Sequence, residues 1–147
     1  MYPLPPQAYS ASVVRRIAEG ILELLREPAT PEEMFAASPR WPPEQGAGWK
    51  GGGWRPAPWL TPRLAARLPW VQIGNPSGTG HALVRYTLLA MSNANLIELS
   101  ITPMSTSAVG RIRFLRVREG AESIDLRRVF REPRRPRYAP WRTRAEY

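Results

Sequence analysis

The C-terminal segment carries the residues whose types and spacing could do chemistry. Arginines alternate there with aromatic residues, and Phe130 lies among them; the set is Arg127, Arg128, Arg131, Arg134, Arg135, Arg137, Tyr138, Trp141, Arg142 and Arg144. A guanidinium pairs with phosphate as a planar fork of donors, and aromatic rings stack on unpaired bases. The pattern therefore favours single-stranded nucleic acid. It also suits an anionic bilayer, where arginine meets headgroups and tryptophan lies at the interface. A basic terminus that is merely solvated is the third interpretation.

Positive charge is concentrated in the same part of the chain. The chain has 147 residues and a formal net charge of +9. Residues 111–147 hold twelve arginines against five acidic residues, which is a net +7. Of the 21 basic residues only Lys50 is a lysine, a bias that suits phosphate binding but that a GC-rich coding sequence would also produce. The charge indicates a polyanionic partner.

Four tryptophans lie in a segment rich in proline and glycine, residues 38–60: Trp41, Trp49, Trp54 and Trp59. Proline and glycine at this density predict a long irregular segment. Large aromatic side chains that stay exposed mark contact with a partner or a membrane. The alternative is that these tryptophans cover a small core.

Residues for metal or enzymatic chemistry are sparse. The chain has no cysteine and a single histidine, His81. This leaves no metal-ligand cluster and no recognisable Ser–His–Asp relay. Residues 74–81 are close to a phosphate-binding loop, but His81 and Ala82 stand where Lys and Ser or Thr belong, so a turn is the simpler interpretation. We predict a non-enzymatic protein with no metal, no cofactor and no small-molecule substrate.

The first elements that must position these residues are helical. Residues 1–12 are predicted as an extended Pro-rich arm, and helices are predicted over residues 13–26, 31–37 and 63–68. Apolar residues at helical spacing support the first helix, which Ser12 is placed to cap. Thr30 and Glu33 form a capping box that opens the second helix.

Strands are predicted to follow at Trp70–Ile73, Ala82–Met91, Leu96–Thr102 and Arg111–Arg118. Along residues 96–102, apolar and polar residues alternate, so one face should be buried. In the last strand Ile112 and Phe114 share a face, while Leu115 and Val117 share the other. This slip predicts a bulge, or burial on both faces. Residues 124–130 fit either a short helix or a strand.

The predicted fold class is α+β. N-terminal amphipathic helices would pack on a mainly antiparallel β-sheet, with a long Trp/Gly/Pro-rich loop and a basic C-terminal tail. A single domain is expected over residues 13–130, followed by an Arg-rich tail over residues 131–147. No apolar run approaches the roughly 18 residues of a membrane span, and no secretory leader is recognisable. An intracellular protein without a transmembrane span is the expectation.

Three segments of the predicted strand region resemble a known family. They are Gly80-His81-Ala82-Leu83-Val84, Leu96-Ile97-Glu98-Leu99-Ser100 and Arg113-Phe114-Leu115-Arg116-Val117. In order and approximate spacing they look like the central part of bornavirus matrix proteins, across about residues 78–118. The resemblance implies a small matrix protein of a negative-strand RNA virus. Such proteins self-assemble, line the inner membrane leaflet and contact the viral ribonucleoprotein.

Two functions from different classes follow as expectations. The first is a viral matrix-like protein that forms a homo-oligomer, binds the inner face of an anionic membrane in an infected host cell, and contacts RNA or ribonucleoprotein. Such a protein would also be present in the virion. The alternative is an RNA-binding protein or silencing suppressor that acts through the Arg/aromatic C-terminal segment and has no membrane role.

Overall fold

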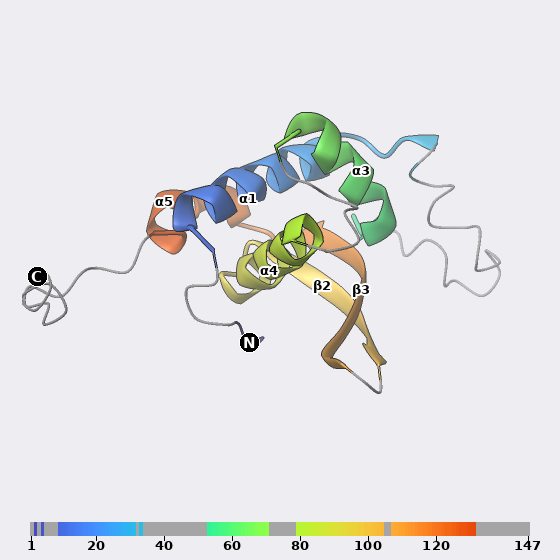
Figure 1. Cartoon of the computed structure of the whole chain (residues 1–147). Coiled ribbons are helices and arrows are strands. Elements are labelled where there is room, and N and C mark those ends of the chain that lie inside the picture. Colours follow the sequence, from blue (N-terminus) through green and yellow to red (C-terminus); the bar gives the residue numbers. More distant parts are fainter. Residues whose placement is uncertain are drawn as a thin grey trace, which may run out of the picture.

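Helices lie on one face of a three-stranded antiparallel sheet (Figure 1). The computed structural model describes residues 9–31, 53–70, 79–104 and 107–131, together with residues 2, 4 and 33. The elements in chain order are α1 (Ala11–Arg26), β1 (Arg55–Pro56), α3 (Ala57–Arg67), α4 (Thr79–Asn93), β2 (Ile97–Met104), β3 (Ser107–Val117), the 3-10 helix η2 (Ala121–Ser123) and α5 (Leu126–Val129). The predicted α+β class is therefore confirmed.

Helix α1 lies at the centre of the core. Its apolar residues recur every three or four positions, so one face is apolar, and Ile17 and Ile21 are fully buried. The helix predicted over residues 13–26 is confirmed. It begins earlier than predicted, at Ala11. Ser10 takes the N-cap position, which corrects the prediction that Ser12 caps the helix and that the extended arm runs to residue 12.

Helix α3 is longer than the helix predicted over residues 63–68, because its prolines are tolerated. It begins at Ala57, inside the segment predicted to be irregular, which corrects that prediction. Pro58 lies in the first turn, where no intrahelical hydrogen bond is lost. Pro62 removes one such bond farther along the helix. Burial of Leu64 and of its neighbours on the inner face offsets that loss.

Helices α1 and α3 approach each other closely at Gly20. A Cβ at this position would lie 3.3 Å from the Cδ1 atoms of both Leu64 and Leu68. Glycine inside a helix costs about 1 kcal/mol relative to alanine, so the close helix contact gives a physical reason for its presence. At the exposed edge of the same contact, Arg67 pairs with Glu23 and Glu27.

Residues 79–93 form the helix α4, which corrects the strand predicted at Ala82–Met91. The buried residues of this segment are Leu83, Val84, Thr87, Leu88, Leu89 and Met91. Apart from Leu89 they recur at helical spacing, which places them on one face of a helix. A continuous apolar run fits a buried strand as well as a helix, so the pattern alone does not separate the two.

The end of α4 is a turn that leads directly into β2. Asn95 has a φ of 62°, in the left-handed region that asparagine tolerates. Its N–H donates to the Ser92 carbonyl at 3.1 Å, and the Leu96 N–H donates to the Met91 carbonyl at 2.9 Å. These two bonds form a Schellman cap. The cap therefore joins a helix to β2, where two consecutive strands were predicted.

Strands β2 and β3, predicted at residues 96–102 and 111–118, pair with each other as an antiparallel hairpin. Both extend farther toward the hairpin tip than predicted. Figure 1 shows this tip projecting away from the helices. The strand order β1-β3-β2 places β2 at the edge of the sheet. Trp70 lies in a turn, and the rest of the strand predicted at residues 70–73 lies outside the described residues.

A bulge, one of the two alternatives predicted for β3, is present. Leu99 pairs with Leu115, but Ile101 pairs with Ile112, so β3 contributes one extra residue, Arg113, between these positions. The bulge shifts the register by one residue. Ile112 and Leu115 therefore share the helix-covered face of the sheet, although their spacing would put them on opposite faces of a regular strand.

A buried guanidinium connects β1 to the end of α1. Arg55 is 6% exposed and Glu33 is fully buried. The Arg55 Nη2 atom donates to Glu33 Oε1 at 2.6 Å, and Nε donates to Oε2. Its Nη1 atom donates to the carbonyls of Leu25 at 3.1 Å and Glu27 at 2.8 Å. The guanidinium carbon lies 4.6 Å from the centroid of the Trp59 ring. Every nitrogen of this guanidinium therefore has an acceptor.

The capping box predicted at Thr30 and Glu33 is half present. The Thr30 hydroxyl accepts from the Glu33 N–H at 3.1 Å, as a capping residue does. The Glu33 carboxylate is bound by Arg55, a partner that no local pattern indicates. Residues 34–37 of the predicted second helix lie outside the described residues.

Candidate nucleic-acid interface

The short helix α5 orients the first of the predicted binding arginines. The Asp125 side chain caps the helix by accepting from the Arg127 N–H at 3.0 Å. Leu126 packs against the core and Phe130 is buried in it, so these two residues anchor the helix. Arg127 and Arg128, between the two anchors, are exposed. The helical alternative for residues 124–130 is thus the correct one.

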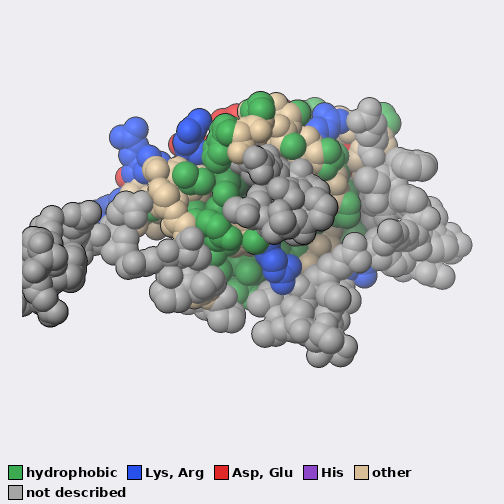
Figure 2. Space-filling view, viewed as in Figure 1, with side chains coloured by type: hydrophobic (Ala, Val, Ile, Leu, Met, Phe, Trp, Pro, Cys, Tyr) green, Lys and Arg blue, Asp and Glu red, His purple; other side chains and the backbone are tan. Residues whose placement is uncertain are grey.

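Arg127, Arg128 and Arg131 are all exposed, and we call them the α5 arginines. None of them forms an ion pair with another residue that the structure describes. Figure 2 shows basic side chains gathered at the α5 end of the molecule, where the C-terminal segment begins. Guanidinium donors exposed in this way are available for charge-assisted hydrogen bonds to phosphate.

The remaining predicted residues of the C-terminal segment lie outside the described residues: Arg134, Arg135, Arg137, Tyr138, Trp141, Arg142 and Arg144. One aromatic residue of the segment is described, Phe130, and it is 7% exposed. Its ring is part of the core and is not presented on the surface beside the α5 arginines. This corrects the interpretation of Phe130 as one of the stacking residues.

The tryptophans of the Trp/Gly/Pro-rich segment lie in different environments. Trp59 is 5% exposed and belongs to the core, which corrects its prediction as a partner or membrane contact. Its ring turns inward because residue 59 lies on the buried face of α3. Trp54 is half-buried, with the Arg116 guanidinium 4.6 Å from its ring centroid. Trp41 and Trp49 lie outside the described residues.

Trp70, just beyond α3, is the exposed tryptophan of the described residues. It is 42% exposed, and the Arg16 guanidinium of α1 lies 5.0 Å from its ring centroid. A cation over an aromatic face is a favourable contact in water and at a membrane interface. This pair is a second place where an arginine and an aromatic ring meet on the surface.

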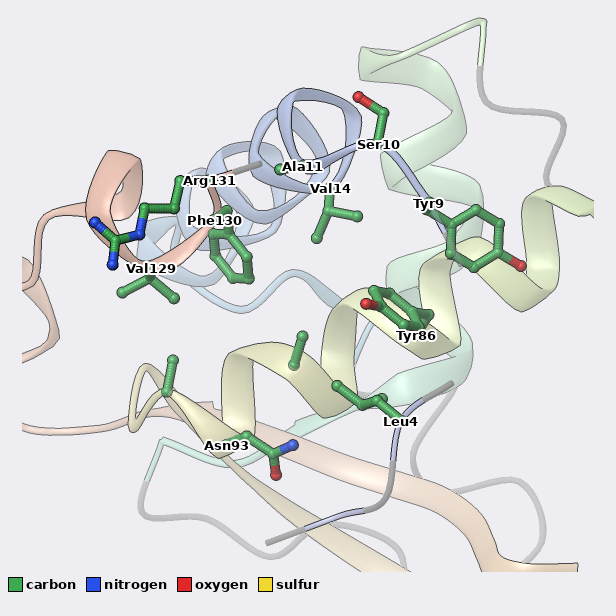
Figure 3. A pocket seen from close by; sticks show the side chains of 12 residues that line it. Leu4, Tyr9, Ser10, Ala11, Val14, Tyr86, Asn93, Val129, Phe130 and Arg131 are labelled. Carbon is green, nitrogen blue, oxygen red and sulfur yellow. The ribbon is translucent and has the colours of Figure 1, made fainter. Parts of the chain in front are cut away.

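A cavity of about 590 Å³ opens between α1, α4 and α5 (Figure 3). Tyr9 and Tyr86 line it together, with ring centroids 5.1 Å apart and ring planes inclined at 68°. Arg131, one of the α5 arginines, also lines it. No pattern in the sequence indicates this cavity, because its walls come from segments far apart in the chain. No local spacing relates Tyr9 to Tyr86.

Two further findings concern membranes and metals. None of the helices in the described ranges is long and apolar enough to cross a bilayer. Across the same residues, His, Cys, Asp and Glu side chains do not gather in groups of three that could hold a metal ion.

No protein-family model, curated protein or solved structure matches this chain. The similarity to bornavirus matrix proteins therefore rests on the three quoted segments alone, the first of which lies in α4. Function is accordingly inferred from the residues of this chain.

Proposed function

We propose that this protein binds single-stranded RNA through the α5 arginines and the Arg-rich segment that follows them. The observation that carries the proposal is the exposure of Arg127, Arg128 and Arg131 beside the start of that segment. Leu126 and Phe130 anchor α5 to the core, so the backbone that carries these arginines is held in place. Residues 132–147 add five more arginines, together with Tyr138 and Trp141.

RNA binding is the activity that the two expected functions share. Arginine contacts with phosphate give affinity for any nucleic acid, whereas stacking on aromatic rings requires unpaired bases. The combination of both residue types therefore favours single strands over duplexes. In A-form duplexes the bases are stacked on each other and cannot reach an aromatic ring.

A matrix-like function is the second proposal, favoured by Trp70 and Arg16. Their exposed ring and guanidinium would suit the interface of an anionic bilayer. Residues 131–147 carry six arginines and two glutamates, a net +4. Each net positive charge near an anionic leaflet contributes about 1 kcal/mol of binding free energy. One copy of the chain would therefore bind with roughly 4 kcal/mol, which corresponds to a Kd of about 1 mM. Stable attachment therefore needs several copies acting together.

Binding to the two anionic partners separates the proposals. Fluorescence anisotropy with a labelled single-stranded RNA should give saturable binding, weaker for a duplex of equal charge. Cosedimentation with anionic vesicles should be weak for a monomer and strong for an oligomer, with neutral vesicles as the control. Absence of binding to single-stranded RNA at low salt would contradict the proposed function.

Self-association is the property on which the matrix-like proposal depends. Strand β2 lies at the edge of the sheet. Among the described strands, β3 alone pairs with it. Such an edge can pair with a second copy of the chain. Light scattering at tens of micromolar is expected to show a discrete oligomer. A monodisperse monomer would exclude the matrix-like function and leave RNA binding as proposed.

A further inference from the structure

The cavity beside α5 has the size and lining of a site for one nucleotide. Its volume of about 590 Å³ lies within the roughly 300–1,000 Å³ of small-molecule pockets. Figure 3 shows Tyr86 projecting from α4 beside Tyr9, with Val14 and Phe130 on the opposite wall. The lining is thus apolar and aromatic, with a few polar groups at its edge.

The two tyrosines are arranged so that a base can stack. Their rings meet edge to face, with planes inclined at 68°, so ring faces remain outside the Tyr9–Tyr86 contact. Stacking of an unpaired base on such a face stabilises the complex. Tyr86 comes from the middle of α4, a 15-residue helix, so its position is fixed before a ligand arrives.

Asn93 holds a further part of the lining in place. Its Oδ1 atom accepts from the Tyr2 N–H at 2.7 Å, and its Nδ2 atom donates to the Tyr2 carbonyl at 2.9 Å. This double contact ties the N-terminal segment to the end of α4, and Leu4 of that segment lines the cavity. The site is therefore built from both ends of the described chain.

The charge of the lining favours an anion at the rim. Among the lining residues the charged one is Arg131, and none is acidic. Figure 3 shows the Arg131 guanidinium at the edge, turned away from the interior. For the phosphate of a base inside the cavity to meet this cation, the exposed Arg131 side chain has to rotate toward the opening. The same arginine belongs to the α5 arginines, so the cavity is continuous with the RNA-binding surface.

We infer that the cavity takes one unpaired base of the bound RNA, stacked on Tyr86, with the adjoining phosphate at Arg131. The inference rests on the proposed RNA-binding function and adds a specific subsite to it. An apolar peptide would fill the same volume, but it would leave the edge cation without a partner. A base with its phosphate uses both the aromatic wall and the charge.

Tyr86→Leu and Tyr86→Phe form a matched pair of tests. Leucine keeps an apolar side chain but removes the ring, whereas phenylalanine keeps the ring and removes only the hydroxyl. Affinity for single-stranded RNA should fall about tenfold in Y86L and stay within about twofold of wild type in Y86F. Affinity for heparin, a polyanion without bases, should not change in either variant.

A second variant and a direct measurement cover the case in which Y86L does not fold. Ala90→Leu would fill the cavity from α4 and should also lower RNA affinity while leaving heparin binding unchanged. In wild type, adenosine monophosphate should shift the Tyr86 ring resonances, which the Y86F spectrum identifies, and inorganic phosphate should not.

The outcomes separate this inference from the proposed function. Wild-type RNA affinity in both Y86L and A90L, or Tyr86 resonances that do not move with the nucleotide, would overturn the base site and leave RNA binding intact. A wild-type protein that binds heparin but not RNA would remove the proposed function itself. An apolar peptide that displaces the nucleotide from Tyr86 without affecting heparin binding would assign the cavity to a peptide.

Discussion

Arg55→Met is expected to lower the free energy of unfolding by about 3–5 kcal/mol, because it leaves a carboxylate buried without its partner. Glu33 is fully buried and is held by two nitrogens of Arg55. The substitution also removes the donor to the Leu25 and Glu27 carbonyls at the end of α1. The total free energy of unfolding of a domain of this size is about 5–15 kcal/mol, so urea denaturation should readily detect the loss.

Arg67→Met is the matched control, since it makes the same chemical change at an exposed ion pair. The Arg67 side chain is 33% exposed, and its partners Glu23 and Glu27 are 59% and 42% exposed. Exposed pairs contribute about 0–1 kcal/mol. Combining Arg55→Met with Glu33→Met should recover part of the loss, because no charge is then buried alone. Equal destabilisation by Arg55→Met and Arg67→Met would refute the structural role of Arg55.

Deletion of residues 132–147 is expected to weaken single-stranded RNA binding by about a thousandfold at about 0.1 M salt. The segment holds five arginines. Each phosphate contact contributes about 0.7 to the slope of log affinity against log salt for single strands, so the slope should fall by about 3.5. The α5 arginines remain in the truncated chain and should retain weak binding. Titrations of labelled RNA into both proteins measure the difference.

A full-length variant separates charge from chain length in that experiment. It replaces the five arginines of residues 132–147 by glutamine and keeps Tyr138 and Trp141. Its salt slope should match that of the deletion, while its affinity should be somewhat higher because the aromatic residues remain. If the variant bound like the wild type, the arginines of this segment would not be the phosphate contacts.

Local patterns were sufficient for some elements of the fold. The periodic apolar face predicted α1, and alternation predicted β2 and β3. The slip in the apolar pattern of residues 111–118 predicted a bulge or burial on both faces. The structure has the bulge at Arg113, which moves Ile112 to the face of Leu115, while Phe114 is buried outside the main core. In each case the signal lies within a few residues of the structure that it determines.

Elements with ambiguous local signals were predicted wrongly. The apolar run of α4 fits a buried strand as well as a helix, and the choice depends on packing against β2 and α1. The prolines of α3 indicate irregular chain, but Pro58 occupies a permitted position and Leu64 is buried. Trp59 was therefore assigned to a loop, although it belongs to the core.

Contacts between distant residues had no sequence signal at all. Arg55 and Glu33 are 22 residues apart, and Asn93 and Tyr2 are 91 apart. Neither pair follows a spacing that secondary structure imposes. The basic character of the C-terminal segment was recognisable because it depends on composition. The cavity beside it was not, because its shape depends on how α1, α4 and α5 pack.

The salt dependence of single-stranded RNA binding by the full chain tests the central claim most directly. The six arginines of residues 131–147 predict a log–log slope of about −4. Contacts from Arg127 and Arg128 would make the slope steeper still. A slope of about −4 or steeper would support binding through these cations. A slope near zero, or no measurable binding at low salt, would contradict it.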